Sequence, residues 1–166
     1  MTIIKNFQLL ADFNAWANTK IFSSCKKLDE SEYKKDRKAF FTSIHGTLNH
    51  LLVVDNLYIS RIEGKDHNIR SMDQILHDNI DDLEDARMKK DKHLVDLVNN
   101  LSVENINKEI TYKSFDTTVH TFTINFILMT LFNHQTHHRG QVHNMLSQAG
   151  IKPPQIDIPD FIGNVM

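Results

Sequence analysis

Four long segments of this 166-residue chain repeat apolar residues every three or four positions, and this pattern limits the fold more than any other feature. Such spacing places the apolar side chains on one face of a helix. The segments are 4–26, 41–63, 71–101 and 124–149. The sequence contains five Gly and three Pro, few enough for long helices to continue uninterrupted. We therefore expect an all-α fold, a single domain over 1–166, in which four helices surround one core.

Local signals indicate where these helices begin and end. Gly64 is placed to cap the second helix, and Gly150 followed by two prolines closes the last one. Ser71 with Gln74 three residues later resembles a capping box, which predicts that the third helix begins there. The charged stretch 26–38 predicts a connector with one helical turn, and the mixed charges of 81–93 predict a solvated helix face.

One segment departs from the helical pattern. Residues 109–123 are rich in Thr, Tyr, Phe and Val, which favours a short hairpin or an extended crossover. The residues after the last helix are expected to pack across the bundle. On the first helix, Asn14 and Asn18 fall on the apolar face, so they either bridge helices or support a site.

Charge and cysteine content exclude several classes of protein. The net charge is −2 and the lysines are scattered among acids, so binding to a nucleic-acid backbone is not expected. No apolar stretch approaches the length of a membrane span, and the N-terminus lacks the features of a signal peptide. A lone Cys25 cannot form an intramolecular disulfide and is expected to pack in the core. We expect a cytoplasmic protein that binds neither nucleic acid nor membranes.

Histidines give the strongest functional signal. His134 and His138 are four residues apart, so both imidazoles project from one helix face, about 40° apart. Alone, the pair is equally consistent with buried histidines held by hydrogen bonds. His50 on the second helix shares an apolar face with Val54 and can complete a three-histidine metal site.

The remaining histidines are placed less favourably for metal binding. Position on a helix or polar surroundings in the sequence assign five of them to the surface, and His120 stays ambiguous. His137 is a candidate fourth ligand or supporting group, although a rim position is favoured. Gln141, Asn18 and Asp55 are candidates to orient the imidazoles, or are purely structural. The five surface assignments are His45, His67, His77, His93 and His143.

The last helix carries LFNHQTHHRGQVH at 131–143, which resembles the signature of the DinB family of DinB/YfiT-like metalloenzymes. WAN at 16–18, TLNHLLVVD at 47–55 and Arg61 agree with this resemblance. It implies an up-down-down-up four-helix bundle, a homodimer, and metal ligands at His50, His134 and His138. It also covers relatives that use a small-molecule thiol in S-transfer or isomerisation. This chain ends soon after the last helix, unlike maleylpyruvate-isomerase-like relatives, so we do not transfer their specific reaction.

Three imidazoles leave at least one position open on an ion, as catalytic sites do. The sequence thus predicts a metal-dependent enzyme, a hydrolase or thiol S-transferase, in which the ion activates water or a low-molecular-weight thiol against a small-molecule substrate. Zinc or nickel suits imidazole donors best. No Glu follows His134 as in a His-Glu-x-x-His metalloprotease. The alternatives are a non-catalytic, stress-induced, dimeric metal-binding protein and a helical interaction module without metal.

Overall fold

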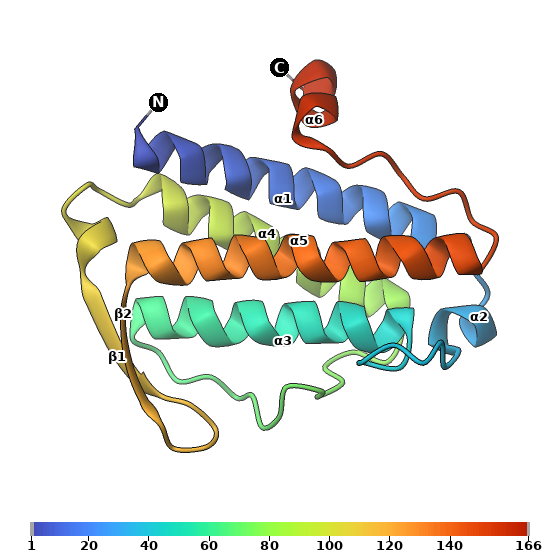
Figure 1. Ribbon diagram of the computed structural model, residues 1–166, viewed down its shortest axis with the longest axis horizontal. Coiled ribbons are helices and arrows are strands. Elements are labelled where there is room, and N and C mark those ends of the chain that lie inside the picture. Colours follow the sequence, from blue (N-terminus) through green and yellow to red (C-terminus); the bar gives the residue numbers. More distant parts are fainter. Residues whose placement is uncertain (1, 166) are drawn as a thin grey trace.

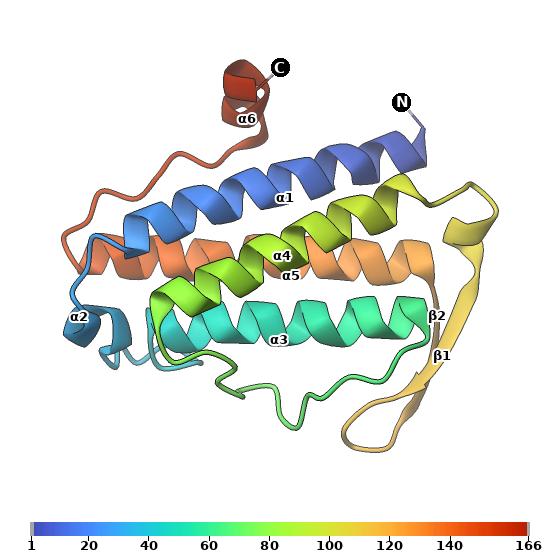
Figure 2. The same ribbon diagram turned by 180° about the vertical axis from the view of Figure 1, so that it is seen from behind.

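Four long helices lie side by side in the computed structural model, which describes residues 2–165 (Figures 1 and 2). The fold is mostly helical, as predicted, and also contains a small two-stranded sheet. The long helices are α1 (Ile3–Cys25), α3 (Ile44–Glu63), α4 (Ile80–Asn99) and α5 (Ile124–Gln148). The shorter elements are α2 (Glu30–Lys34), η1 (Asn105–Asn107), β1 (Glu109–Lys113), β2 (Val119–Thr123) and α6 (Ile158–Val165).

Side-chain caps explain where the helices begin. Ser43, Asn79 and Thr123 each accept a hydrogen bond from a backbone N–H in the first turn of α3, α4 and α5, which satisfies a donor that the helix leaves unpaired. At the other end, Gly64 caps α3 with a φ of 66°. Gly150 follows α5 with a φ of 76°, and both values lie in the left-handed region that glycine adopts without strain.

The segment 109–123 is a hairpin, as the β-branched and aromatic residues predicted. Strands β1 and β2 pair antiparallel with Thr111 opposite Thr121, and the hydroxyls of these two residues lie 2.9 Å apart. Thr123 ends β2 and caps α5, so the hairpin leads directly into the last long helix. The hairpin projects at one end of the bundle (Figure 1).

The predicted start of the third helix at Ser71 was wrong, because α4 begins at Ile80. Residues 65–79 instead return along α3 as an irregular segment (Figure 1). Side chains of α3 hold this segment: the buried Asn49 accepts hydrogen bonds from the backbone of Leu76 and His77 at 2.8 and 3.0 Å. These tertiary bonds satisfy two backbone amides of the segment, which therefore need no helical partners.

The prediction that 81–93 is a solvated face holds for exposed residues such as Asp81, Asp85 and Lys89. It fails for Arg87 and Asp91, which are buried, with 1% and 3% of their surface exposed. Arg87 lies 2.6 Å from Asp55 on α3 and 2.8 Å from Asp91. Burial alone would lower the pKa of Arg87, but the charges of Asp91 and Asp55 outweigh it and raise the pKa. The guanidinium therefore stays charged inside the bundle.

Seven buried residues from all four long helices form what we call the central polar network. Asn14 and Asn18 on α1 each donate to Asp91 at 3.1 Å, and Gln135 on α5 donates to Asp55 at 2.7 Å. Asn14 and Asn18 thus bridge helices, one of the two roles predicted for them. The network comprises Asn14, Asn18, Asp55, Arg87, Asp91, Gln135 and Arg139.

Two apolar clusters lie on either side of this network along the bundle. One contains Phe22, Leu48, Leu83 and other residues near α2, and the second contains residues such as Leu94 near the hairpin. Each long helix contributes to the first cluster, then to the network, and then to the second cluster, or in the reverse order. The polar layer therefore separates two apolar layers and restricts how the helices can slide past one another.

The chain after α5 packs against α1. Phe161 of α6 is buried, and its ring centroid lies 6.1 Å from that of Phe13 and 5.6 Å from that of Trp16. α6 stands on the far side of α1 from the other long helices (Figure 2). Within residues 2–165, no helix combines the length and the apolar character that a membrane span requires.

Replacing Arg87 with Ala should lower the free energy of unfolding by about 3–5 kcal/mol, because two buried carboxylates would lose their shared cation. Lys89→Ala, an exposed change on the same helix, serves as the control and should shift stability by less than about 0.5 kcal/mol. Urea unfolding followed by circular dichroism measures both. Equal stability of the two variants would contradict a structural role for the network.

Candidate metal centre

Helices α3 and α5 bring His50, His134 and His138 together. One nitrogen of each imidazole lies within 4.8 Å of those of the other two, and no other group of potential ligands in residues 2–165 is this compact. His50 and His138 are buried, with 3% and 7% of their surface exposed, and His134 is half-buried. Two histidines four residues apart on α5 and a third on the facing α3 therefore lie together, as their positions in the sequence predicted.

Hydrogen bonds fix which nitrogens of His50 and His138 face the cluster. Nδ1 of His50 lies 2.7 Å from the carbonyl oxygen of Met72, which can only accept, so Nδ1 carries the proton. Nδ1 of His138 lies 2.7 Å from Oε1 of Gln141 and donates to it in the same way. In the neutral imidazoles, Nε2 of both residues consequently keeps its lone pair, the form that binds a metal.

The environment keeps all three imidazoles neutral. Burial, together with the neighbouring His138 and His50, lowers the pKa of His134 to about 3. Burial lowers the pKa of His138 to about 4, although the hydrogen bond to Gln141 opposes the shift. Burial also lowers the pKa of His50, against the effect of the Met72 carbonyl. At neutral pH the site thus presents uncharged donors without competing protons.

These donors fit a divalent transition metal. Nε2 of His50 and Nε2 of His134 lie 2.9 Å apart, too close for two facing lone pairs unless a proton or a cation lies between them. A tetrahedral ion with nitrogen ligands at 2.0–2.1 Å holds those nitrogens about 3.3 Å apart, so little movement is required. The buried Nδ1 of His134 has no hydrogen-bond partner within the described chain, unlike those of His50 and His138.

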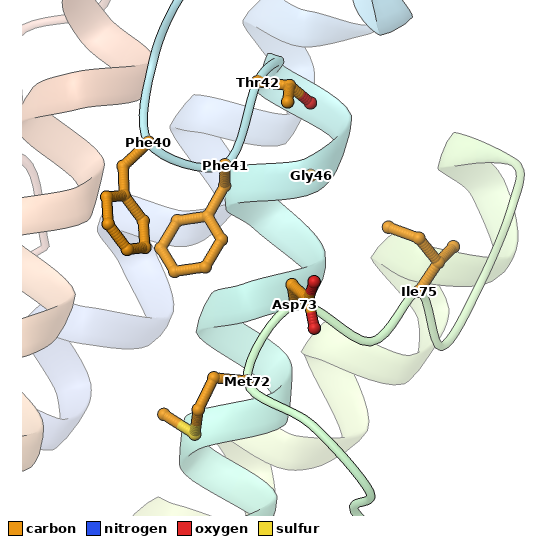
Figure 3. A pocket seen from close by; sticks show the side chains of 7 residues that line it. All are labelled: Phe40, Phe41, Thr42, Gly46, Met72, Asp73 and Ile75. Atoms are coloured by element: carbon orange, nitrogen blue, oxygen red, sulfur yellow. The ribbon is translucent and has the colours of Figure 1, made fainter.

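A cleft of about 580 Å³ opens near the start of α3, and it is connected to the histidine cluster (Figure 3 shows the cleft). Phe41 connects the two features: its ring stacks on His50 with centroids 3.7 Å apart, and the same residue lines the cleft. Phe40, Phe41 and Thr42 come from the segment before α3, while Met72, Asp73 and Ile75 come from the segment between α3 and α4 (Figure 3). The cleft is thus mostly apolar, with one carboxylate.

The segment that presents the two phenylalanines is tightly folded. Thr42 has a φ of 62°, and its N–H donates to the carbonyl of Ala39 at 2.8 Å. Gly46 is required here, because a Cβ at that position would lie 2.1 Å from the carbonyl oxygen of Phe41. This turn leaves Phe40 86% exposed and directs Phe41 onto the imidazoles.

The structure separates the predicted supporting residues into two groups. Gln141 contacts His138, and its amide nitrogen lies 3.1 Å from Nε2 of the exposed His137, whose ring neighbours that of His138. Asn18 and Asp55 instead find their partners in the central polar network. Asn18 and Asp55 are polar residues of the kind that can orient a metal ligand, but their hydrogen-bond and ion-pair partners are Asp91, Arg87 and Gln135 rather than the imidazoles.

His45 corrects the prediction that five histidines lie on the surface. It is buried, with 7% of its surface exposed, and Nε2 lies 3.1 Å from the carbonyl oxygen of His77. The reason is that His77, in the segment before α4, and the ring of Tyr33 both contact His45. The partly exposed His93 pairs with Glu63 at 2.7 Å. Burial raises the pKa of the Cys25 thiol to about 12, in agreement with a packing role for this residue.

Sequence reasoning missed the residues that complete the surroundings of the cluster. Phe41 was expected to begin α3, yet it stacks on His50, and Met72 was expected in a helix, yet its carbonyl accepts from the same imidazole. Asn49, next to His50, gave a usable signal, because a polar residue in an apolar helix requires hydrogen-bond partners. Those partners are the backbone amides of the segment that carries Met72.

The comparisons with known proteins agree with this architecture. The model of the DinB family matches residues 3–164, so the chain belongs to the DinB family. It is 26% identical to Protein DinB of Bacillus subtilis (strain 168) over 147 residues, and this match covers 85% of this chain and 84% of that protein. Its fold is similar to that of a DinB-like protein from Bacillus cereus ATCC 10987, with a TM-score of 0.65, 19% identity, and coverage of 85% and 91% of the two chains.

The metal-free protein should lose stability as the pH falls from about 6.5 towards 4. The folded-state pKa values of His134 and His138 lie near 3 and 4, below the unfolded value of about 6.5, so the unfolded chain binds protons first. The contribution is complete above pH 6.5 and is lost as the pH drops through the folded values. Urea midpoints of chelator-treated protein at about pH 7 and about pH 5 measure it.

The same titration of His134→Gln supplies the control, because this change removes the group with the lowest histidine pKa. The variant should lose less stability between the two pH values than the wild-type protein. An equal loss in both proteins would mean that the histidine cluster does not cause the pH dependence.

Proposed function

We propose that this DinB-family chain is a metal-dependent enzyme that acts on a small molecule, with His50, His134 and His138 as the ligands of one divalent ion. The observation that carries the proposal is the compact, buried set of three neutral imidazole nitrogens. Zinc or nickel is the proposed ion, because nitrogen donors without thiolate suit both. Hydrolysis or transfer of a small-molecule thiol is the proposed reaction class.

The cleft beside the cluster supports catalysis over a purely structural ion. A structural zinc site is usually closed by four protein ligands, whereas three ligands leave room for a reactant. Phe41 and Met72 each contact His50 and also line the cleft, so one residue separates the cleft from the cluster. The apolar walls formed by Phe40, Phe41, Met72 and Ile75 favour a substrate with an apolar portion.

When bound, the ion supplies Lewis acidity that lowers the pKa of a water or thiol in its open position. The chain itself provides orientation and exclusion of water. The Met72 carbonyl and Gln141 hold the rings of His50 and His138, and the stacked ring of Phe41 shields His50 from solvent. Because Cys25 is buried and protonated, a thiol reactant has to come from solution.

We further propose that the four long helices follow the up-down-down-up course that the family resemblance implies. The long return of residues 65–79 along α3 supports this course, because it brings the start of α4 back to the end of the bundle where α3 starts (Figure 1). A homodimer and a cytoplasmic location remain predictions from the sequence.

A non-catalytic role is the competing function. An ion bound to His50 on α3 and to two histidines on α5 would join the helices and contribute to folding free energy directly. Exchange of solvent on the ion separates the two roles. Water-proton relaxation enhanced by a paramagnetic divalent ion in the site favours catalysis, and an ion closed to solvent favours a structural role.

Metal content tests the proposal. Tag-free wild-type protein should carry about one zinc or nickel ion per chain by plasma mass spectrometry, and the double variant His134→Ala/His138→Ala should lose it. His143→Ala, on the same helix but outside the cluster, is the matched control and should retain the ion. Wild-type protein that stays metal-free after incubation with both ions would overturn the proposal.

Gln141→Ala should weaken metal binding by about 10- to 100-fold, because His138 would lose the acceptor that fixes its tautomer and orientation. Asn144→Ala, an exposed change on the same helix, should leave the affinity unchanged. Competition with a chromogenic chelator measures both. Identical affinities would show that Gln141 does not orient the ligand.

A further inference from the structure

A second cavity, of about 520 Å³, lies between α5 and the segment that follows it. It shares no lining residue with the cleft beside the histidines. Phe13, Pro153, Pro154 and Ile156 form apolar walls, and Arg139 of the central polar network also lines it. The cavity thus joins an apolar surface to a buried cation.

Arg139 is 3% exposed, yet only neutral oxygens receive its hydrogen bonds. One amino group donates to Asn14, Asn18 and Gln135. The other donates to the hydroxyl of Thr136 at the long distance of 3.5 Å. Within residues 2–165, no carboxylate forms an ion pair with it, because Arg87 takes both carboxylates of the network. A buried cation normally has a direct anionic partner, and this one has a cavity at its side.

Other cavity residues suit an anion. Lys152 adds a second positive charge at the exposed edge, and the Thr136 hydroxyl and the His143 ring add polar atoms. Gly140 lies in the middle of α5, where glycine costs helix stability, and a Cβ there would meet no atom within 4 Å. Its absent side chain leaves the cavity open beside Arg139.

We propose that this cavity binds a monocarboxylate carried on an apolar body, with the carboxylate at Arg139 and Lys152 and the body against Phe13 and Ile156. The planar guanidinium matches a carboxylate, and the apolar walls favour an aromatic or aliphatic acid over a free inorganic anion. Asp157, which also lines the cavity, disfavours a ligand with two negative charges. The site is independent of the metal centre.

Benzoate is the probe, benzamide its neutral analogue, and inorganic phosphate the free anion. Chemical-shift titration of the labelled full chain should show saturable benzoate binding with shifts at Arg139 and Gly140, and weaker binding of benzamide and phosphate. Gly140→Leu, which fills the cavity with a better helix former, and Lys152→Gln should each weaken benzoate binding about tenfold.

Asn144→Leu is the matched control, because it adds the same side chain to an exposed position of α5 outside the cavity lining, and it should bind benzoate as the wild type does. The double variant His134→Ala/His138→Ala should also retain binding, which separates this site from the metal centre. The proposal is overturned if benzoate fails to bind, if benzamide or phosphate binds as tightly, or if Gly140→Leu binds unchanged.

Discussion

Arg87 holds Asp55 and Asp91 at the centre of the bundle, and the geometry of the histidines depends on this interaction. Gln135 donates to Asp55 and directly follows His134 on α5, while Asp55 lies five residues after His50 on α3. A polar contact between two helices has few acceptable positions, whereas apolar side chains can repack after a small slide. The network therefore fixes the register of α3 against α5, and with it the distance between His50 and His134.

The second determinant of the site is irregular backbone held by polar side chains of α3. His45, Asn49 and His50 each bond the segment 65–79, and the tight turn before α3 places Phe41 on His50. These contacts give one histidine its tautomer and form the cleft beside the cluster. The helices carry the ligands, and the two connecting segments set the access of solvent and substrate.

Periodicity and spacing predicted most of the helices and the histidine cluster, because both depend on the geometry of a single helix or of two facing ones. The hairpin at 109–123 was predicted from its composition, and the caps at Gly64 and Gly150 from local backbone preference. The start of α4 and the burial of Arg87 were not predicted. The capping box at Ser71 does not start a helix, because Asn49 bonds the backbone of this segment. The burial of Arg87 and Asp91 could not be recognised among the charges of 81–93, because their partners on other helices are far away in sequence.

Asn18 and Asp55 illustrate the same limit, since residue type suggested a role near the metal while their nearest charged neighbours placed them in the network.

The central claim is that three imidazoles hold one ion. X-ray absorption spectroscopy of the zinc-loaded protein tests it most directly. Three nitrogen scatterers at about 2.0–2.1 Å with imidazole multiple scattering, plus at least one further light atom, are expected. Fewer than three imidazoles, or a sulfur scatterer at about 2.3 Å, would contradict the claim.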